Sequence, residues 1–210
     1  MKVAILSESP ADEAAIRILV AAILGRKTQE VSLEPIRTRG WPAVINILPA
    51  VVPRLHYHTD ADALAVVVDS DDSPIHQLSH DKSGGEDMEC RLCRLRYEVN
   101  LQTSKLRTVA GRSIIKTALG LAVPAIEAWY LCGLDPQVNE ATWARKLGHE
   151  SISYTKKSLK NAVYGHERPS IMIETTRAVE AANRLSADVP LLEQLFPNGF
   201  RTFADDVRNW

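Results

Sequence analysis

Two strongly apolar segments of this chain each run into acidic residues. The first occupies residues 2–7 and is followed by Glu8, and the second occupies residues 63–69, ends in Asp69 and is followed by Asp71 and Asp72. Consecutive apolar residues without polar alternation are typical of strands covered on both faces, as in a parallel sheet, which binds its ligands beyond the carboxyl ends of the strands. Carboxylates gathered there repel one another unless a divalent cation lies among them, and oxygen ligands suit Mg²⁺ or Mn²⁺. The sequence therefore predicts an acidic metal site at the carboxyl edge of a parallel sheet.

The order of apolar patterns along the chain predicts an α/β fold. We expect strands at 2–7, 31–37, 63–69 and 113–123, and helices at 10–24, 41–56, 87–107 and 124–132. This alternation predicts a four-stranded, mainly parallel, Rossmann-like sheet with flanking helices. From residue 134 onward the pattern is helical. We therefore expect an α/β domain over residues 1–133 and a helical C-terminal extension, residues 134–210, packed on it.

Composition narrows the class of protein. The chain has 210 residues, 45% of them hydrophobic and 24% charged, as in ordinary globular proteins. No segment approaches the roughly 18 to 20 uninterrupted apolar residues of a membrane span, so we expect no membrane partner. The start, MKVAILSESP, is poor as a signal peptide because its short apolar run ends in a glutamate. Three cysteines argue against a disulfide scaffold and for a reducing compartment, so the expected location is cytoplasmic.

Charge is unevenly distributed although the net charge is only −1. Residues 54–89 hold nine acids and two bases, whereas residues 91–116 hold seven bases and one acid. A second basic stretch covers residues 145–160. An acidic centre between basic segments suits a metal site acting on a phosphate polyanion such as nucleic acid, and the alternative is solvated helix faces. The candidate nucleic-acid contacts are Arg91, Arg94, Arg112, Lys156 and Lys157.

Five acidic residues are the candidate metal ligands. Asp69 and Asp71, at positions i and i+2 of a strand end, would point to the same side and reach one ion. Glu8 at the adjacent strand end would complete the ligand set or act as general acid/base. Asp12 lies one helical turn past Glu8, and Glu127 lies in the first turn of a helix facing the same crevice. The alternative for each is structural, since strand ends and first helical turns commonly carry acids.

A further group, His76-x3-His80-x9-Cys90-x2-Cys93, has residue types that bind zinc. The spacing is not that of a standard zinc finger, and the two cysteines fall inside a helical pattern. We therefore expect Cys90 and Cys93 to pack on the apolar face of that helix. The chain has no Walker A or GxGxxG motif, so a bound nucleotide cofactor is not expected.

The acidic motifs also resemble a known family. Residues 8–12 read Glu-Ser-Pro-Ala-Asp, residues 69–71 read Asp-Ser-Asp and residues 123–129 read Val-Pro-Ala-Ile-Glu-Ala-Trp. The first two resemble the topoisomerase–primase (Toprim) pattern of a glutamate after the first strand, usually in Glu-Gly-x-x-Asp, and Asp-x-Asp after the third. Ser9 stands where that pattern usually has glycine. The last segment is similar to small bacterial Toprim-like proteins related to the nuclease domain of OLD (overcoming lysogenization defect) proteins of phage defence.

The resemblance covers residues 1–133 and implies metal-assisted phosphodiester hydrolysis. Asp69 and Asp71 would hold Mg²⁺ or Mn²⁺, Glu8 would be a ligand or proton acceptor, and Asp12 and Glu127 would support a second ion. The resemblance also implies a basic side chain for the phosphate charge, for which the candidates are Arg112 and Lys116. A partner ATPase or a second copy of the chain would be possible partners. The alternative is a Toprim-like binding or regulatory module without turnover.

Overall fold

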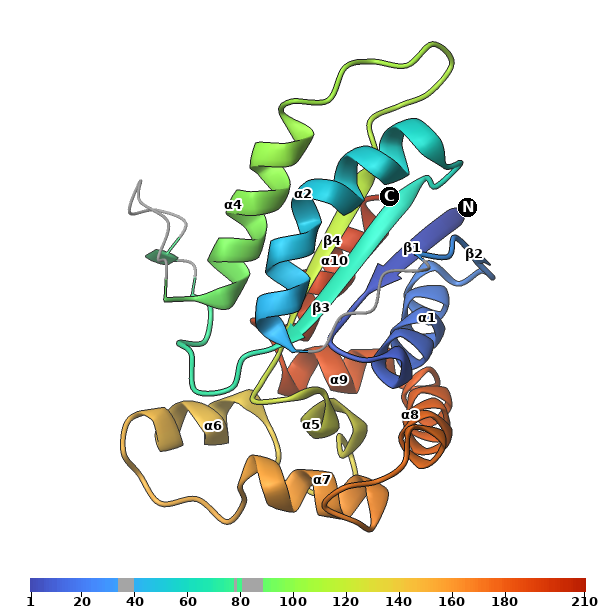
Figure 1. Cartoon of the computed structure of the whole chain (residues 1–210). Helices are drawn as coiled ribbons and strands as arrows, with labels where there is room; N and C mark the ends of the chain where they lie inside the picture. The colour runs from blue at the N-terminus through green and yellow to red at the C-terminus, as the bar shows by residue number, and fades with distance from the viewer. Residues whose placement is uncertain (34–39, 78, 81–88) are drawn as a thin grey trace.

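The computed structural model describes residues 1–33, 40–77, 79–80 and 89–210. Within these residues the sheet has four strands, all parallel, in the order β2-β1-β3-β4 (Figure 1). The strands are β1 (Lys2–Leu6), β2 (Gln29–Glu30), β3 (Ala63–Asp69) and β4 (Lys116–Ala122). The prediction of an α/β fold with a four-stranded parallel sheet is confirmed.

Helices cover both faces of the sheet and its carboxyl edge. The helices before β4 are α1 (Pro10–Leu24), α2 (Trp41–His58) and α4 (Arg91–Thr103), and those after it are α5 (Ile126–Tyr130), α6 (Glu140–Leu147), α7 (Lys156–Tyr164), α8 (Ile171–Leu185), α9 (Val189–Leu195) and α10 (Phe200–Arg208). One face is covered by α2 and α4 and the other by α1 and α10, and α8 packs against α1 (Figure 1). Beyond the carboxyl ends of the strands lie α5, α6 and α7. None of the helices in the described part of the chain has the length and apolar character of a membrane span.

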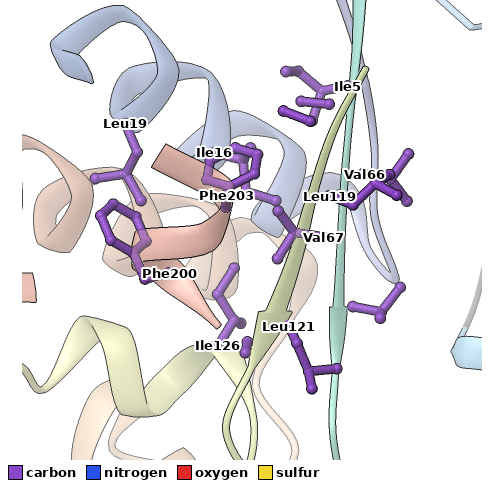
Figure 2. Packing of buried hydrophobic residues seen from close by; sticks show 14 of the residues in the cluster. Ile5, Ile16, Leu19, Val66, Val67, Leu119, Leu121, Ile126, Phe200 and Phe203 are labelled. Atoms are coloured by element: carbon purple, nitrogen blue, oxygen red, sulfur yellow. The ribbon is translucent and has the colours of Figure 1, made fainter. Parts of the chain in front are cut away.

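The C-terminal helices share the hydrophobic core with the sheet. Phe200 and Phe203 of α10 are fully buried and belong to the same core cluster as Ile16 and Leu19 of α1, on one face of the sheet (Figure 2). Gly120 of β4 makes this packing possible, since a Cβ atom there would lie 3.1 Å from the Val67 side chain and 3.2 Å from Phe203. The missing side chain lets α10 lie directly against the centre of the sheet.

The helix that follows β1 begins as the sequence predicts. Ser9 is the N-cap of α1, its Oγ accepts a hydrogen bond from the Asp12 N–H at 3.2 Å, and Pro10 occupies the first turn. This cap fixes the direction in which the chain leaves Glu8, and it places the first turn of α1 at the carboxyl edge of the sheet.

Some predicted boundaries differ from the structure. The strand expected at 31–37 lies in part outside the described residues; β2 pairs with β1 through only two residues, and residues 31–33 are not in a strand. The helix expected at 87–107 is shorter, because α4 begins at Arg91, and residues 87–88 lie outside the described part. The strand expected at 113–123 is β4, which begins at Lys116 where pairing with Ala63 of β3 starts.

Candidate functional site

Glu8 joins the ends of the two central strands. Its Oε1 accepts a hydrogen bond from the Asp69 backbone N–H at 2.9 Å. Because β1 and β3 are parallel neighbours, the residues that follow them emerge at the same edge of the sheet. Glu8 and Asp69 therefore lie together, as the sequence predicts.

Asp69 contacts both a backbone donor and a lysine at this edge. Its Oδ1 accepts a hydrogen bond from the Ile126 N–H at 3.0 Å, and its Oδ2 lies 3.6 Å from Lys156 Nζ. Burial raises the pKa of Asp69 well above its usual value, and repulsion from Glu127 and Glu8 raises it further, while Lys156 lowers it. Burial is thus the main cause of the raised pKa, and the neighbouring acids add to it.

Asp71 reaches the site by a different route from the one expected. The strand ends at Asp69, and Asp71 lies in the following turn with a left-handed backbone, φ 51°. Its N–H donates to Pro124 O at 2.9 Å, which anchors the turn after β3 to the segment after β4. The Asp71 carboxylate pairs with Lys156 and, at 2.7 Å, with Arg91. The turn, not the pleat of the strand, therefore directs Asp71, and Lys156 lies between Asp71 and Asp69.

Asp12 belongs to the same group of acids. Its carboxylate accepts hydrogen bonds from Ser9 Oγ at 2.8 Å and from the Tyr130 hydroxyl at 3.3 Å. Burial raises the pKa of Asp12 to about 7 against these hydrogen bonds, and repulsion from Glu127 and Glu8 contributes to the rise. Asp12 is thus both part of the N-terminal cap of α1 and a member of the acidic site.

Glu127, in the first turn of α5, brings an acid to the site from a third strand–helix junction, the one after β4. Its side chain is only 7% exposed and is hydrogen-bonded to Tyr164, and Lys160 lies near enough to interact with it. Burial raises the pKa of Glu127, and the nearby Glu174 adds to the rise. Glu127 and Asp69 line the same pocket, and the charge of Glu127 contributes to the raised pKa of Asp69, so the two carboxylates belong to one site.

A pocket of about 400 Å³ opens beside these acids. Its lining combines acidic residues with the basic residues of α7 and the segment after it: Asp69, Glu127, Lys156, Lys157, Lys160, Glu167 and Arg168. Lys156 and Lys157 occupy the first turn of α7, where the helix dipole disfavours positive charge. The local stability of α7 therefore does not explain these lysines, whereas the acids across the pocket do.

Two basic residues expected near the phosphate lie elsewhere. Lys116 begins β4 and pairs with Ala63, whereas Asp69 pairs with Ala122 at the other end of the strands. Lys116 therefore lies about 20 Å from the carboxyl edge of the sheet where the acids gather, here called the acidic edge. Arg112 is also remote from this edge. Its guanidinium donates to carbonyl oxygens at the end of α2 and in the turn that follows: Leu55, His56, Thr59 and Ala61. The basic character of residues 91–116 was visible in sequence, but these backbone partners were not, and neither residue faces the acids.

Arg91 and Arg94 belong to α4 and lie near the acidic edge, on the face of the sheet covered by α2 and α4. Both guanidinium groups lie 5.4 Å from the ring centre of Trp41, in cation–π contact. Arg91 also donates to Asp69 O at 2.6 Å. Of the basic candidates, Arg91, Lys156 and Lys157 therefore surround the acidic residues. The structure adds Lys160 and Arg168, of which Lys160 belongs to the basic stretch recognised in sequence and Arg168 lies just beyond it.

Cys90 and Cys93 pack in the core, as expected, and they also lie beside His76 and His80. Within the described residues, one group of histidine, cysteine or acidic side chains brings its ligand atoms within 4.8 Å of one another, and it consists of His76, His80, Cys90 and Cys93. These four residues could hold a metal ion. The structure therefore supports the prediction of a metal-binding protein only in a general form. These residues could hold an ion, but nitrogen and sulfur ligands suit a softer ion than Mg²⁺ or Mn²⁺.

No protein-family model, curated protein or solved structure matches the chain. The Toprim resemblance consequently rests on the sequence motifs, and the function must be argued from the residues at the site.

Proposed function

We propose that the protein hydrolyses phosphodiester bonds of nucleic acid with Mg²⁺ or Mn²⁺ held by the acids at the carboxyl edge of the sheet. One observation carries the proposal: Glu8, Asp12, Asp69 and Glu127, from three different strand–helix junctions, gather beside a pocket lined by the lysines of α7. Acids that bind cations and cations that bind phosphate are the two parts of a metal-dependent phosphodiesterase.

The protonation behaviour of the acids supports a divalent cation among them. The pKa values of Asp12, Asp69 and Glu127 are all raised, chiefly by burial, and mutual repulsion adds to this for Asp12 and Asp69. A divalent cation offsets both effects, because it compensates the charge that burial and repulsion disfavour. Asp69 and Asp71 would hold one ion, with Glu8 as a ligand or as the proton acceptor, and Asp12 and Glu127 would support a second. When bound, such an ion supplies Lewis-acid polarisation of a phosphate oxygen.

The remaining steps fall to the side chains of this chain. Lys156 reaches both Asp69 and Asp71 and would turn from them to a phosphate oxygen of the substrate. Lys157, Lys160 and Arg168 line the same pocket and would bind the neighbouring phosphates. The Glu8 carboxylate uses Oε1 to hold the Asp69 N–H, which leaves Oε2 to accept a proton from the attacking water.

The sequence motifs agree with this proposal. Glu8 follows β1 and Asp69-Ser70-Asp71 follows β3, in the order of the Toprim pattern. The similarity of residues 123–129 to OLD-related proteins favours a cytoplasmic role in phage defence, with a partner ATPase or a second copy of the chain as possible partners.

The test is nucleic-acid cleavage by the purified protein with Mn²⁺ or Mg²⁺, comparing wild type with Asp69→Asn. Asparagine keeps an oxygen to accept the Ile126 N–H but removes the charge, so the fold should persist while cleavage falls by about 100-fold or more. Asp60→Asn is the matched control, because Asp60 is exposed and pairs with Lys2 at the opposite edge of the sheet. Equal cleavage by wild type and Asp69→Asn would show that the acidic edge is not the site of hydrolysis.

A second candidate function is a nucleic-acid-binding or regulatory module without turnover. The observation that favours it is the pairing of Asp71 with Arg91 and Lys156, which neutralises part of the acidic site without an ion. Calorimetry distinguishes the two: the module would bind nucleic acid but show no saturable Mn²⁺ binding that depends on Asp69.

A further inference from the structure

The four side chains of the His/Cys group have the separations of a tetrahedral zinc site. His76 Nδ1 lies 3.8 Å from Cys90 Sγ and 3.4 Å from Cys93 Sγ, and His80 Nδ1 lies 4.0 Å from Cys93 Sγ. Around a tetrahedral zinc ion, bonds of about 2.3 Å to sulfur and 2.05 Å to nitrogen place these two atom types about 3.6 Å apart. These three separations differ from that value by only a few tenths of an ångström, and all four ligand atoms lie within 4.8 Å of one another.

The local structure explains why these ligands meet. Cys90 is the N-cap residue of α4 and Cys93 lies in its first turn, a spacing of three residues that places both on one side of the helix. No side-chain hydrogen bond caps the helix at Cys90, so capping does not account for the cysteine there. His76 belongs to the segment after β3, and its Nδ1 lies within 4 Å of both cysteine sulfurs. His76, Cys90 and Cys93 are buried, and His80 is partly exposed.

We propose that His76, His80, Cys90 and Cys93 bind a structural zinc ion that fixes the start of α4 to the segment after β3. Four protein ligands complete the tetrahedron and leave no position for a substrate, which is the mark of a structural site. The positive end of the α4 dipole at Cys90 also stabilises the negative charge of zinc-bound thiolates.

This zinc ion would hold Arg91, which contacts two residues of the acidic edge, in place. Arg91 lies between the two cysteine ligands in sequence, and its guanidinium donates to Asp69 O at 2.6 Å and pairs with Asp71 at 2.7 Å. Fixing Cys90 and Cys93 fixes the backbone of Arg91 and, through it, the turn that carries Asp71. Arg91 is thus a positioning residue for that turn, whatever chemistry the acidic edge performs.

Arg96 regulates how easily the ion binds. Its Nη1 lies 3.0 Å from His76 Nε2, and because arginine only donates, Nε2 accepts and the His76 proton lies on Nδ1. Zinc on Nδ1 moves that proton to Nε2, where it would face the arginine donor. Arg96 must then turn away, and Asp206, which already interacts with it, is the available partner. Arg96→Gln offers Nε2–H an acceptor instead and should bind zinc about 10-fold more tightly.

The experiment measures metal content and needs no nucleic-acid substrate, so its result is independent of the proposed hydrolysis. Protein purified under reducing conditions should contain one zinc per chain by mass spectrometry of the metal. After removal of zinc and addition of Co²⁺, the protein should show the visible absorption of a tetrahedral ion with a thiolate charge-transfer band. Cys93→Ala should lose the zinc and the band, and Cys132→Ala should keep both, because Cys132 is equally buried but lies outside the group.

Hydrogen exchange tests the second half of the proposal on the wild-type chain. A zinc-selective chelator should increase exchange in the first turn of α4 and in residues 69–73 but not in α8. If Cys93→Ala does not fold, the Co²⁺ spectrum and chelator response of the wild type decide the question. Wild-type protein that takes up neither zinc nor Co²⁺ after reduction, or that contains a Cys90–Cys93 disulfide under reducing conditions, overturns the proposal. Tighter Zn²⁺ binding by wild type than by Arg96→Gln overturns the role given to Arg96.

Discussion

Replacing Asp12 by asparagine should remove a specific part of the pH dependence of stability. The folded protein raises the pKa of Asp12 from 3.8 to about 7, chiefly through burial. Asparagine keeps the shape of the side chain: its oxygen accepts from the Tyr130 hydroxyl, and its NH₂ group donates to Ser9 Oγ. The substitution therefore removes the titration while keeping the contacts that surround it.

The sign and size of the effect follow from linkage. A raised pKa means that the protonated form is favoured in the fold, so the contribution of Asp12 is fully present below about pH 4 and is lost as pH rises through about 7. A shift of about three units corresponds to about 4 kcal/mol, of which about two thirds falls between pH 5 and pH 8. The Asp12 side chain keeps some contact with solvent, and screening by that solvent reduces the expected change in stability to about half. Wild type should thus lose about 1 to 1.5 kcal/mol more than Asp12→Asn between these pH values.

Urea denaturation at pH 5 and pH 8, without added Mg²⁺ or Mn²⁺, measures this difference directly. Glu13, whose pKa burial also raises to about 7, titrates in both proteins and cancels in the comparison. Millimolar Mn²⁺ at pH 8 should stabilise wild type more than Asp12→Asn, because the ion stabilises the ionised carboxylate. Parallel pH profiles for the two proteins would show that Asp12 is already ionised in the fold, and the reasoning about the acidic edge would be wrong.

The parts of the fold that could be predicted from sequence are those where one local pattern decides the structure. Residues 63–68 are all buried, and a strand covered on both faces has consecutive apolar residues, so its pattern was unambiguous. The start of α1 was equally clear, because Ser9 and Pro10 both favour a helix beginning there. β2 was placed poorly because it is a two-residue edge strand with both residues exposed, and burial leaves no pattern in such a strand.

The candidate site divides in the same way. Glu8, Asp69 and Glu127 could be located because each lies at or a few residues past the carboxyl end of a strand, and the parallel topology brings those ends to one edge of the sheet. The partners of basic residues could not be located, since a long side chain can reach any acceptor within several ångströms. Arg112 looked like a phosphate ligand in sequence, yet it binds backbone carbonyls at the far edge of the sheet. Lys156 follows Asp71 by 85 residues in sequence, and only the packing of α7 brings them together.

The remaining predictions test residues with structural roles and the basic side of the pocket. Arg112→Lys should cost about 2 kcal/mol of stability in urea denaturation, because an ammonium group cannot satisfy the same carbonyls, and should leave nucleic-acid affinity unchanged; weaker affinity would restore Arg112 to the binding surface. Gly199→Ala should cost about 3 kcal/mol, because its Cβ would lie 1.9 Å from Leu121 O, whereas Gly148→Ala, with its nearest atom at 3.3 Å, should cost little; equal losses would contradict the close approach. Finally, Lys160→Gln should weaken binding of single-stranded nucleic acid in a fluorescence titration and reduce the slope of log Kd against log salt by about 0.7, the contribution of one phosphate contact. Lys160 faces the pocket that contains Asp69 and Glu127, so the substitution tests whether that pocket receives the phosphate backbone. An unchanged slope would mean that the lysine serves only to balance Glu127, and the path of the nucleic acid would have to lie elsewhere.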